Sequence, residues 1–426
     1  MIKKTICLAL ALVLAFSCVA CGNKSAATDK IELEVIISQY GSYTQQWWEA
    51  FETSFETDNP DIDLKIEVVN WDDLYTVVNT RISTNQTPDI LNIDTFADYV
   101  ADELLMPAEE YTSDALKANI YPSFWEASSV DGTVWGLPIL ASVRTLFTNM
   151  DLLKEAGIDA PPATWDEIMA ASEAIQNTFD GSVVPWALDI STDEGQAAFS
   201  YYSWNNGGDF VDENGEWTLN SEANIEAMHF IKTLFDSGYC NSNPYNDMIY
   251  ALQDAFAAES LAMIIAPCNL YDLAGSVNFE VSAIPTNGKN EAVPMGVCDR
   301  LLVFKDEKAA DQEARTAAIT KFFDYFYECE KYSEYMVFEG FLPVTIDSSE
   351  LLSQNADKFT KSGSGDPGDS EYFAMFCELL ESCRFYPAGK TEWIDVKQGV
   401  IDAEQRMCQG EDAETLLNAL QAELTN

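Results

Sequence analysis

Apolar and polar residues follow a strand–helix–strand pattern over the first hundred residues of the chain. Residues 33–38 form a short apolar run, and residues 62–68 alternate between apolar and charged side chains, so both segments are predicted strands. Aromatic residues recur at helical spacing within residues 47–55, and apolar residues do so within residues 72–82. A third predicted strand lies at residues 90–93. This order predicts an α/β sheet whose parallel strands are joined by crossover helices.

A second α/β region is predicted to begin near Val143. Residues 146–149 have the pattern of a strand, and a helix is expected to open at Thr164, where Glu167 completes the Thr-x-x-Glu form of a capping box. The remaining predicted helices gather in the last hundred residues, at 314–335, 371–382, 393–407 and 412–424. A chain of 426 residues is long enough for two sizeable domains, and the predicted fold class is α/β.

The N-terminus has the features of a secretory signal. Two lysines precede an uncharged, apolar run over residues 6–20, which is too short for a permanent membrane-spanning helix. The end of this run resembles a bacterial lipoprotein cleavage site, in which Cys21 takes a diacylglyceryl group and becomes the new N-terminus. The sequence therefore predicts a signal peptide at residues 1–20 and a protein anchored by lipid to the extracytoplasmic face of the cell membrane. Lipidation at Cys18, and cleavage without lipidation, are the alternatives.

The charge balance limits the classes of partner. The chain holds 71 acidic residues against 23 lysines and arginines, for a formal net charge of −48. Such a charge repels phosphate backbones and anionic membrane surfaces, so no nucleic-acid partner is expected. Hydrophobic residues make up 47% of the chain and aromatic residues 12%, which is typical of a folded protein.

The sequence offers no motif for the common catalytic chemistries. Phosphate-loop, dinucleotide-binding, zincin and nucleophile-elbow patterns are absent, and His229 is the only histidine. No catalytic residue, cofactor or metal site is therefore predicted. The cysteines that follow Cys21 have no tight C-x-x-C spacing, and their state as disulfides or free thiols stays open: Cys240, Cys268, Cys298, Cys329, Cys377, Cys383 and Cys408.

Aromatic, amide and acidic residues follow several of the predicted strands and turns. Ligands of open α/β sheets bind outside the carboxyl ends of strands. Sugar rings suit such residues, because their C–H faces stack on aromatic rings and their hydroxyls need fixed donors and acceptors. The candidate ligand-site residues from this rule are Gln39, Tyr40, Tyr43, Asp94, Trp186, Trp204, Asn206 and Asp209.

Short stretches spread over the chain carry a resemblance to a known family. The stretch with the closest match reads Gly-Thr-Val-Trp-Gly-Leu-Pro at residues 132–138, followed by Leu-Phe-Thr-Asn at 146–149 and Pro-Pro-Ala-Thr-Trp-Asp-Glu at 161–167. Further stretches lie at residues 206–210, 256–263, 283–286 and 340–344. In this order they resemble the extracellular solute-binding proteins of ABC importers, in the maltose-binding-like, sugar-binding branch.

The resemblance implies a periplasmic-binding-protein-like fold with two α/β lobes, a ligand cleft between them, hinge crossings and a helical C-terminal region. A tether at residues 21–30 would precede the lobes. The expected N-terminal lobe comprises residues 31–139 and 299–342, and the expected C-terminal lobe comprises residues 140–298 and 343–426. Crossings between the lobes are expected near residues 138–143, 296–301 and 341–344.

The same resemblance adds residues to the expected ligand site. Arg144, Asp299 and Arg300 lie at or near the expected crossings. Residues 266–269 read Ala-Pro-Cys-Asn where the family often has Gly-Pro-Trp, so a stacking ring is absent there and Asn269 is expected to offer an amide instead. The implied function is the capture of a mono- or oligosaccharide and its delivery to an ABC permease, by a monomer without a cofactor or catalytic activity. A lipid-anchored glycoside hydrolase and a sugar-binding surface or chemosensory protein without a transport role are the alternatives.

Overall fold

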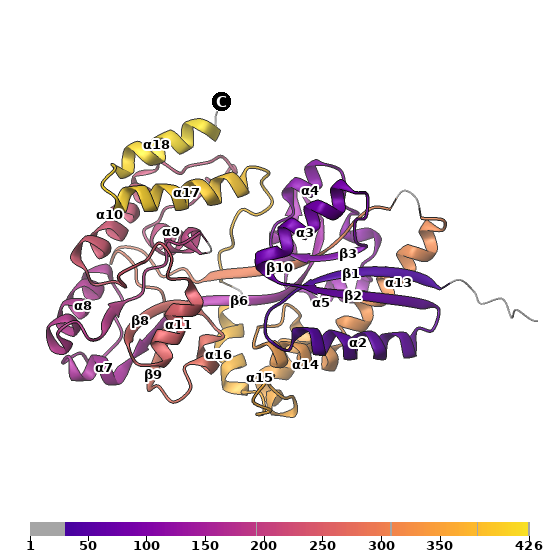
Figure 1. The fold of residues 1–426 in the computed structure, drawn as a ribbon, viewed down its shortest axis with the longest axis horizontal. Helices are drawn as coiled ribbons and strands as arrows, with labels where there is room; N and C mark the ends of the chain where they lie inside the picture. The colour runs from indigo at the N-terminus through magenta and orange to yellow at the C-terminus, as the bar shows by residue number, and fades with distance from the viewer. Residues whose placement is uncertain (1–29, 193, 307–308, 381, 425–426) are drawn as a thin grey trace, which may run out of the picture.

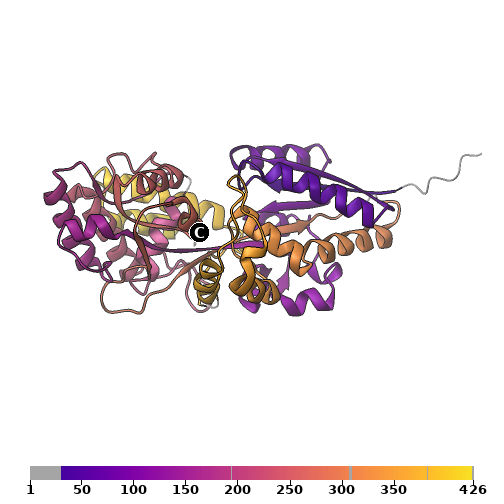
Figure 2. The same ribbon diagram turned by 90° about the horizontal axis from the view of Figure 1, so that it is seen from below.

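Two strands extend through the centre of the molecule and connect its two lobes (Figure 1). The computed structural model describes residues 30–192, 194–306, 309–380 and 382–424. β6 (Gly136–Asn149) is buried along its whole length, and β10 (Met295–Val303) pairs with it in antiparallel fashion. Figure 2 shows the same two bodies from below, with a narrower connection between them. The predicted signal peptide and Cys21 lie outside the described residues.

The N-terminal lobe is built on the parallel strands that the sequence predicts. β1 (Ile31–Ser38) pairs in parallel with both β2 (Ile62–Val69) and β3 (Ile90–Ile93). The crossover helices are α2 (Thr44–Asp58) and α3 (Trp71–Ser83). Every residue of β3 is buried, as expected for a parallel strand that helices cover on both faces. The predicted α/β class is confirmed.

The sheet continues into the C-terminal lobe through β6. β8 (Leu261–Pro267) pairs antiparallel with β6 and parallel with β7 (Val184–Trp186), while β9 (Phe279–Ser282) pairs with the other edge of β6. The full strand order is β2-β1-β3-β10-β6-β8-β7. The strand predicted at residues 146–149 is therefore the end of a much longer one.

Helices cover the C-terminal lobe on both sides. α8 (Trp165–Phe179) begins with the predicted capping box, in which Thr164 and Glu167 each bond the other's backbone N–H. α17 (Trp393–Cys408) and α18 (Ala413–Leu424) pack on α9 (Gly195–Trp204) and α10 (Glu222–Ser237) and complete this lobe (Figure 1). The other helices of this lobe are α7 (Met150–Glu155), α11 (Ile249–Ala257) and α12 (Leu270–Leu273).

The helix expected over residues 314–335 is two helices, α13 (Gln312–Phe326) and α14 (Cys329–Glu339). The prediction of one element is wrong because Glu328 starts a new helix as its N-cap, accepting a hydrogen bond from the Lys331 backbone N–H at 3.2 Å. The remaining short elements are α4 (Ala97–Ala101), η1 (Ala108–Glu110), α5 (Asp114–Asn119), α6 (Pro122–Ala127), β4 (Ser129–Val130), β5 (Thr133–Val134), α15 (Ile346–Asn355), η2 (Ala356–Lys358) and α16 (Ser370–Leu380).

Further segments pass beside β6 and β10 at the centre of the molecule. Leu342 bridges Ala141, with both backbone hydrogen bonds at 2.9 Å. The segment between α16 and α17 runs along β10, where the Gly296 N–H donates to the Arg384 carbonyl at 2.9 Å. A Cβ at Gly296 would lie 2.6 Å from Phe385 Cε1, so this close approach requires glycine. The lobe boundaries given by the resemblance stay a prediction.

The seven cysteines of the described residues are all free thiols. Burial raises the pKa of several of them, including those of Cys298 and Cys377, to about 12. Buried thiols of this kind are unreactive, so they pack as small apolar side chains. Within the described ranges, no helix combines the length and apolar character that crossing a bilayer requires.

Candidate functional site

A cleft opens between the lobes where β6 and β10 run side by side. Its volume is about 740 Å³, which is within the usual range for small-ligand sites. The N-terminal lobe contributes residues at the carboxyl ends of β1, β2 and β3, and the C-terminal lobe contributes residues of α9, α11 and α17 and the end of β8. Eight aromatic side chains belong to its lining: Tyr40, Trp71, Tyr75, Tyr250, Phe341, Phe385, Tyr386 and Trp393.

Seven of the twelve ligand-site residues expected from the sequence line this cleft. They come from both lobes and from the central strands: Gln39, Tyr40, Asp94, Arg144, Asn269, Asp299 and Arg300. The carboxyl-end rule and the resemblance therefore place most of their candidates in one cavity.

Two carboxylates, Asp94 and Asp299, stand on neighbouring strands at the N-terminal wall of the cleft. Asp299 belongs to β10 and Asp94 directly follows β3, and the last residues that pair between these antiparallel strands are Arg300 and Ile93, their immediate neighbours. The Tyr40 hydroxyl donates to Asp299 Oδ2 at 2.8 Å, and the Tyr75 hydroxyl donates to Asp94. Burial, together with the nearby charge of Asp94, raises the pKa of Asp299 to about 7.

Arg300 lines the same wall, but its guanidinium N–H groups already donate hydrogen bonds to other groups of the protein. Its Nη1 donates to the carbonyls of Cys298 at 2.8 Å and Asp94 at 2.9 Å. Its Nη2 donates to the Ala127 carbonyl at 2.6 Å, and its Nε donates to Ser128 Oγ at 3.1 Å. The guanidinium thus fixes the strand ends, and the expected role of Arg300 as a partner for ligand hydroxyls does not fit this geometry.

The C-terminal wall carries an ion pair with spare hydrogen-bonding capacity. Arg144 Nη2 lies 2.6 Å from Glu194 Oε1, and both residues line the cleft. Arg144 Nε and Glu194 Oε2 are buried and have no hydrogen-bond partner among the described residues. An unsatisfied buried polar atom costs about 1–3 kcal/mol, so these two atoms mark where polar groups of a ligand fit.

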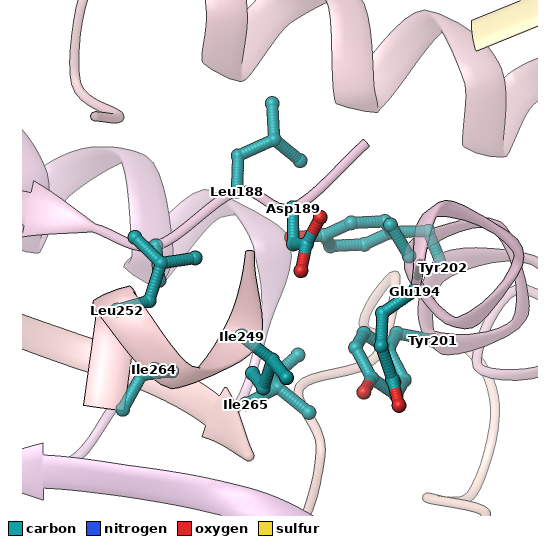
Figure 3. Close-up of a pocket in the computed structure, with 11 residues that line it drawn as sticks. Leu188, Asp189, Glu194, Tyr201, Tyr202, Ile249, Leu252, Ile264 and Ile265 are labelled. Atoms are coloured by element: carbon teal, nitrogen blue, oxygen red, sulfur yellow. The ribbon is translucent and has the colours of Figure 1, made fainter. Parts of the chain in front are cut away.

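A small cavity lies directly behind Glu194 (Figure 3). Its volume of about 20 Å³ leaves room for roughly one water molecule. In Figure 3 the side chains of Glu194 and Tyr201 lie next to each other on one side of it, and Asp189 projects toward its middle. The rest of its wall is mainly apolar, with Ile249, Leu252, Ile264 and Ile265 among the lining residues. The cavity is too small for a solute, so the larger cleft is the candidate site.

Comparisons with known proteins agree with this two-lobed architecture. Residues 38–330 match the family of bacterial extracellular solute-binding proteins, which is more than half of the chain. The chain belongs to this family. A protein of Brucella abortus (strain 2308), named only as a binding protein, is 27% identical to this solute-binding protein over 389 residues, which cover 89% of each chain.

Two solved structures share the fold of this solute-binding protein. Maltose-bound MalE3 of T. maritima superposes with a TM-score of 0.76 at 16% identity, covering 93% of this chain and 99% of that chain. An ABC substrate-binding protein from Listeria monocytogenes in complex with cycloalternan has a TM-score of 0.73 at 20% identity, covering 93% and 98%. At these identities, the likeness confirms the two-lobed periplasmic-binding-protein-like fold.

Trp186 does not reach the cleft of this solute-binding protein. Its side chain is fully buried, and its Nε1 donates to the Tyr202 hydroxyl at 2.9 Å. It belongs to the core between the sheet and the helices of the C-terminal lobe. The expected stacking role is not supported, because β7 turns this ring inward and leaves no face for a sugar.

The turn at residues 204–209 is also part of the core. Trp204 is 2% exposed and donates through Nε1 to Asp209 Oδ1 at 3.0 Å. Asp209 pairs with Arg384 at 3.2 Å, and Asn206 donates to the Ala223 carbonyl at 2.8 Å. These three predicted residues therefore hold the turn against its neighbours, outside the cleft.

Tyr43 lies outside the cleft as well. Its side chain is 44% exposed and lines a separate outer pocket of about 570 Å³, together with residues of the loop at 358–365. α2 begins one residue later, so Tyr43 has already turned away from the strand end where Tyr40 sits.

The sequence analysis missed most of the aromatic lining. Trp71 and Tyr75 follow the carboxyl end of β2, so the rule that found Tyr40 could have found them. Tyr386 comes from the segment before α17 and Trp393 is the first residue of α17, both far along the chain, and no local pattern marks them. Only the tertiary fold brings these two rings to the cleft.

Proposed function

We propose that this solute-binding protein captures a carbohydrate, a mono- or oligosaccharide, in the cleft between its lobes. The observation that carries the proposal is the lining, in which eight aromatic side chains stand beside carboxylate, amide and guanidinium groups. Aromatic rings stack on the C–H faces of sugars, and the fixed polar groups match their hydroxyls. The relatives with bound maltose and cycloalternan support the same class of ligand.

The two walls offer complementary hydrogen-bonding groups. The N-terminal wall presents acceptors on Asp94 and Asp299, and the C-terminal wall presents the unpaired donor Arg144 Nε. Gln253 donates to Asn269 Oδ1 at 3.3 Å, which leaves the amide N–H groups of Asn269 for a ligand. A solute held from both sides favours a closed form, so binding should reduce the radius of gyration in small-angle scattering.

The proposed role continues at the membrane. The protein would be anchored through acylated Cys21, would act as a monomer, and would deliver its solute to the permease of an ABC importer. Because the sequence holds no phosphate-loop motif, the ATPase would be another polypeptide. Intact-mass analysis of the membrane-extracted protein tests the anchor, and an unmodified Cys21 would contradict it.

A glycoside hydrolase is the second candidate, because two carboxylates line the cleft. Hydrolases place their two carboxyl groups on either side of the scissile bond. Asp94 and Asp299 instead stand together on one wall, next to the paired residues Ile93 and Arg300. We therefore propose binding without catalysis. Altered sugar recovered after long incubation would favour the hydrolase.

A thermal-shift screen against a carbohydrate panel tests the proposed ligand class. A ligand that binds only the folded state raises the melting temperature by mass action. Trp71→Ala should then weaken binding of the selected sugar by about 1–3 kcal/mol, because it removes a stacking ring. Trp125→Ala, which removes a half-buried tryptophan outside the cleft, is the matched control. The proposal is wrong if no sugar of the panel raises the melting temperature. It is also wrong if Trp71→Ala binds the selected sugar as tightly as the wild type does.

A further inference from the structure

The carboxylates of Asp94 and Asp299 repel each other, and neutral sugar hydroxyls do not remove this repulsion. Asp94 and Asp299 are the immediate neighbours of the paired residues Ile93 and Arg300, and like charges held this close repel each other. Asp299 is only 7% exposed, so its charge is also poorly solvated. The pair faces the cleft rather than the core, which points to a ligand group as the missing compensation.

Among the described residues, no lysine or arginine forms an ion pair with Asp94 or Asp299. Arg300 is adjacent in sequence, but its guanidinium bonds to three backbone carbonyls and one hydroxyl. Arg144 is paired with Glu194, and Lys397, which lines the same cleft, comes from α17 on the opposite wall. Each carboxylate accepts one tyrosine hydroxyl, and its second oxygen accepts no hydrogen bond from any described residue.

Aromatic rings surround the same end of the cleft. The Tyr40 ring lies 5.9 Å from the Trp71 ring and 5.3 Å from the Phe341 ring, and Tyr75 lies beside Asp94 through its hydrogen bond. The faces of aromatic rings attract cations. Two carboxylates among aromatic rings therefore form a pocket suited to an ammonium group.

We propose that the Asp94–Asp299 end of the cleft binds the ammonium group of an amino sugar. The proposal rests on the carbohydrate function above and narrows its substrate class. An ammonium group has three N–H donors and a positive charge, so one group bonds both free carboxylate oxygens and removes their repulsion. A hydroxyl donates one hydrogen bond and leaves the repulsion in place.

A proton on Asp299 would also remove the repulsion, so protonation competes with binding of an ammonium group. Burial and the charge of Asp94 raise the pKa of Asp299 to about 7, while Tyr40, Arg300 and Arg144 act in the opposite direction. Since a bound ammonium favours the ionised pair, affinity for an amino sugar should fall as pH drops below about 7. A neutral sugar should not lose affinity over this range.

Isothermal titration calorimetry at pH 7 with matched sugars tests the assignment. The pairs are glucosamine with glucose, galactosamine with galactose, mannosamine with mannose, and the glucosamine dimer with cellobiose. We expect an amino sugar to bind roughly tenfold or more tightly than its neutral partner, as a hydrogen bond to a charged group implies. If no amino sugar binds more tightly than its neutral partner, the assignment is wrong, while the carbohydrate proposal stands. If none of these sugars and none of the larger panel binds, the proposed function itself fails.

Asp299→Asn separates the ammonium site from general attraction by an acidic protein. This variant keeps the size of the side chain and should reduce the amino-sugar preference, measured as the ratio of amino-sugar to neutral-sugar affinity, to about onefold. Asp395→Asn removes the same charge from an exposed position on α17 and should keep the preference. Equal loss of the preference in both variants would overturn the assignment to the Asp94–Asp299 pair.

Discussion

The two walls of the cleft differ in how fully their polar groups are already bonded. On the N-terminal wall, Arg300 and Tyr40 direct their donors to backbone carbonyls, Ser128, Asn92 and Asp299. On the C-terminal wall, the ion pair of Arg144 and Glu194 leaves one buried polar atom on each partner without a bond. The donors of the first wall are bonded before a ligand arrives and only carboxylate acceptors stay open, whereas the second wall leaves both a donor and an acceptor open for a ligand.

This difference follows from the origin of each wall. The N-terminal wall sits on the ends of adjacent strands, β1, β3 and β10, whose register fixes the side chains. The C-terminal wall combines β6 with the start of α9, the end of β8 and the segment before α17. Polar groups that one sheet positions can satisfy each other, while groups from separate elements meet only in part.

The largest expected effect is on folding stability, and it should fall on the N-terminal wall. Arg300→Met removes hydrogen bonds to three backbone carbonyls and Ser128 and should lower the free energy of unfolding by about 3–5 kcal/mol. Arg144→Met breaks one ion pair and should cost about 1–3 kcal/mol, while weakening ligand binding. Urea unfolding and calorimetry measure the two quantities. Equal losses of stability in both variants would remove the distinction between the walls.

The sequence predicted the N-terminal wall better than the C-terminal wall for the same reason. Tyr40 and Asp94 follow strand ends, and local pattern is enough to place them in the cleft. The rule failed for Trp186 because a residue after a strand can turn into the core, and only the packing of the neighbouring helices decides which way it turns. Tyr386 and Trp393 needed the complete fold, because nothing local ties them to β6.

The sequence also predicted part of the fold, where local patterns specify the elements. Alternating strands and amphipathic helices specify the parallel crossovers of the first lobe, and a capping box specifies the start of α8. The length of β6 was not predicted, since its fourteen residues are buried throughout and show no alternation to mark where the strand continues. The break between α13 and α14 depends on one N-cap at Glu328 within a continuous helical pattern.

A second, smaller effect is a pH dependence of the free energy of unfolding that comes from Asp299 on the N-terminal wall. The pKa of Asp299 is raised to about 7 by burial and by Asp94, above its value of about 4 in an unfolded chain. The folded state therefore binds the proton more tightly, so this stabilising term is complete below about pH 4 and is lost as pH rises to about 7. Between these limits the wild type should lose about 2–4 kcal/mol relative to Asp299→Asn.

Urea unfolding at steps between pH 4 and pH 8 measures this relative loss. Asp395→Asn controls for the removal of one negative charge from the protein. A constant difference in unfolding free energy between the wild type and Asp299→Asn over the whole range would show that Asp299 does not hold its proton in the folded state.

The smallest effect comes from a single hydroxyl and compares the cleft with the outer pocket. Tyr40→Phe removes the donor to Asp299 and Asn92 and should cost about 0.5–1.5 kcal/mol of stability. Because this hydrogen bond lowers the pKa of Asp299, the same variant should shift the pH-dependent loss of stability to higher pH. Tyr43→Phe removes a hydroxyl outside the cleft and should change stability by less than about 0.5 kcal/mol. Equal responses of the two variants would show that the Tyr40 hydroxyl does not organise the N-terminal wall.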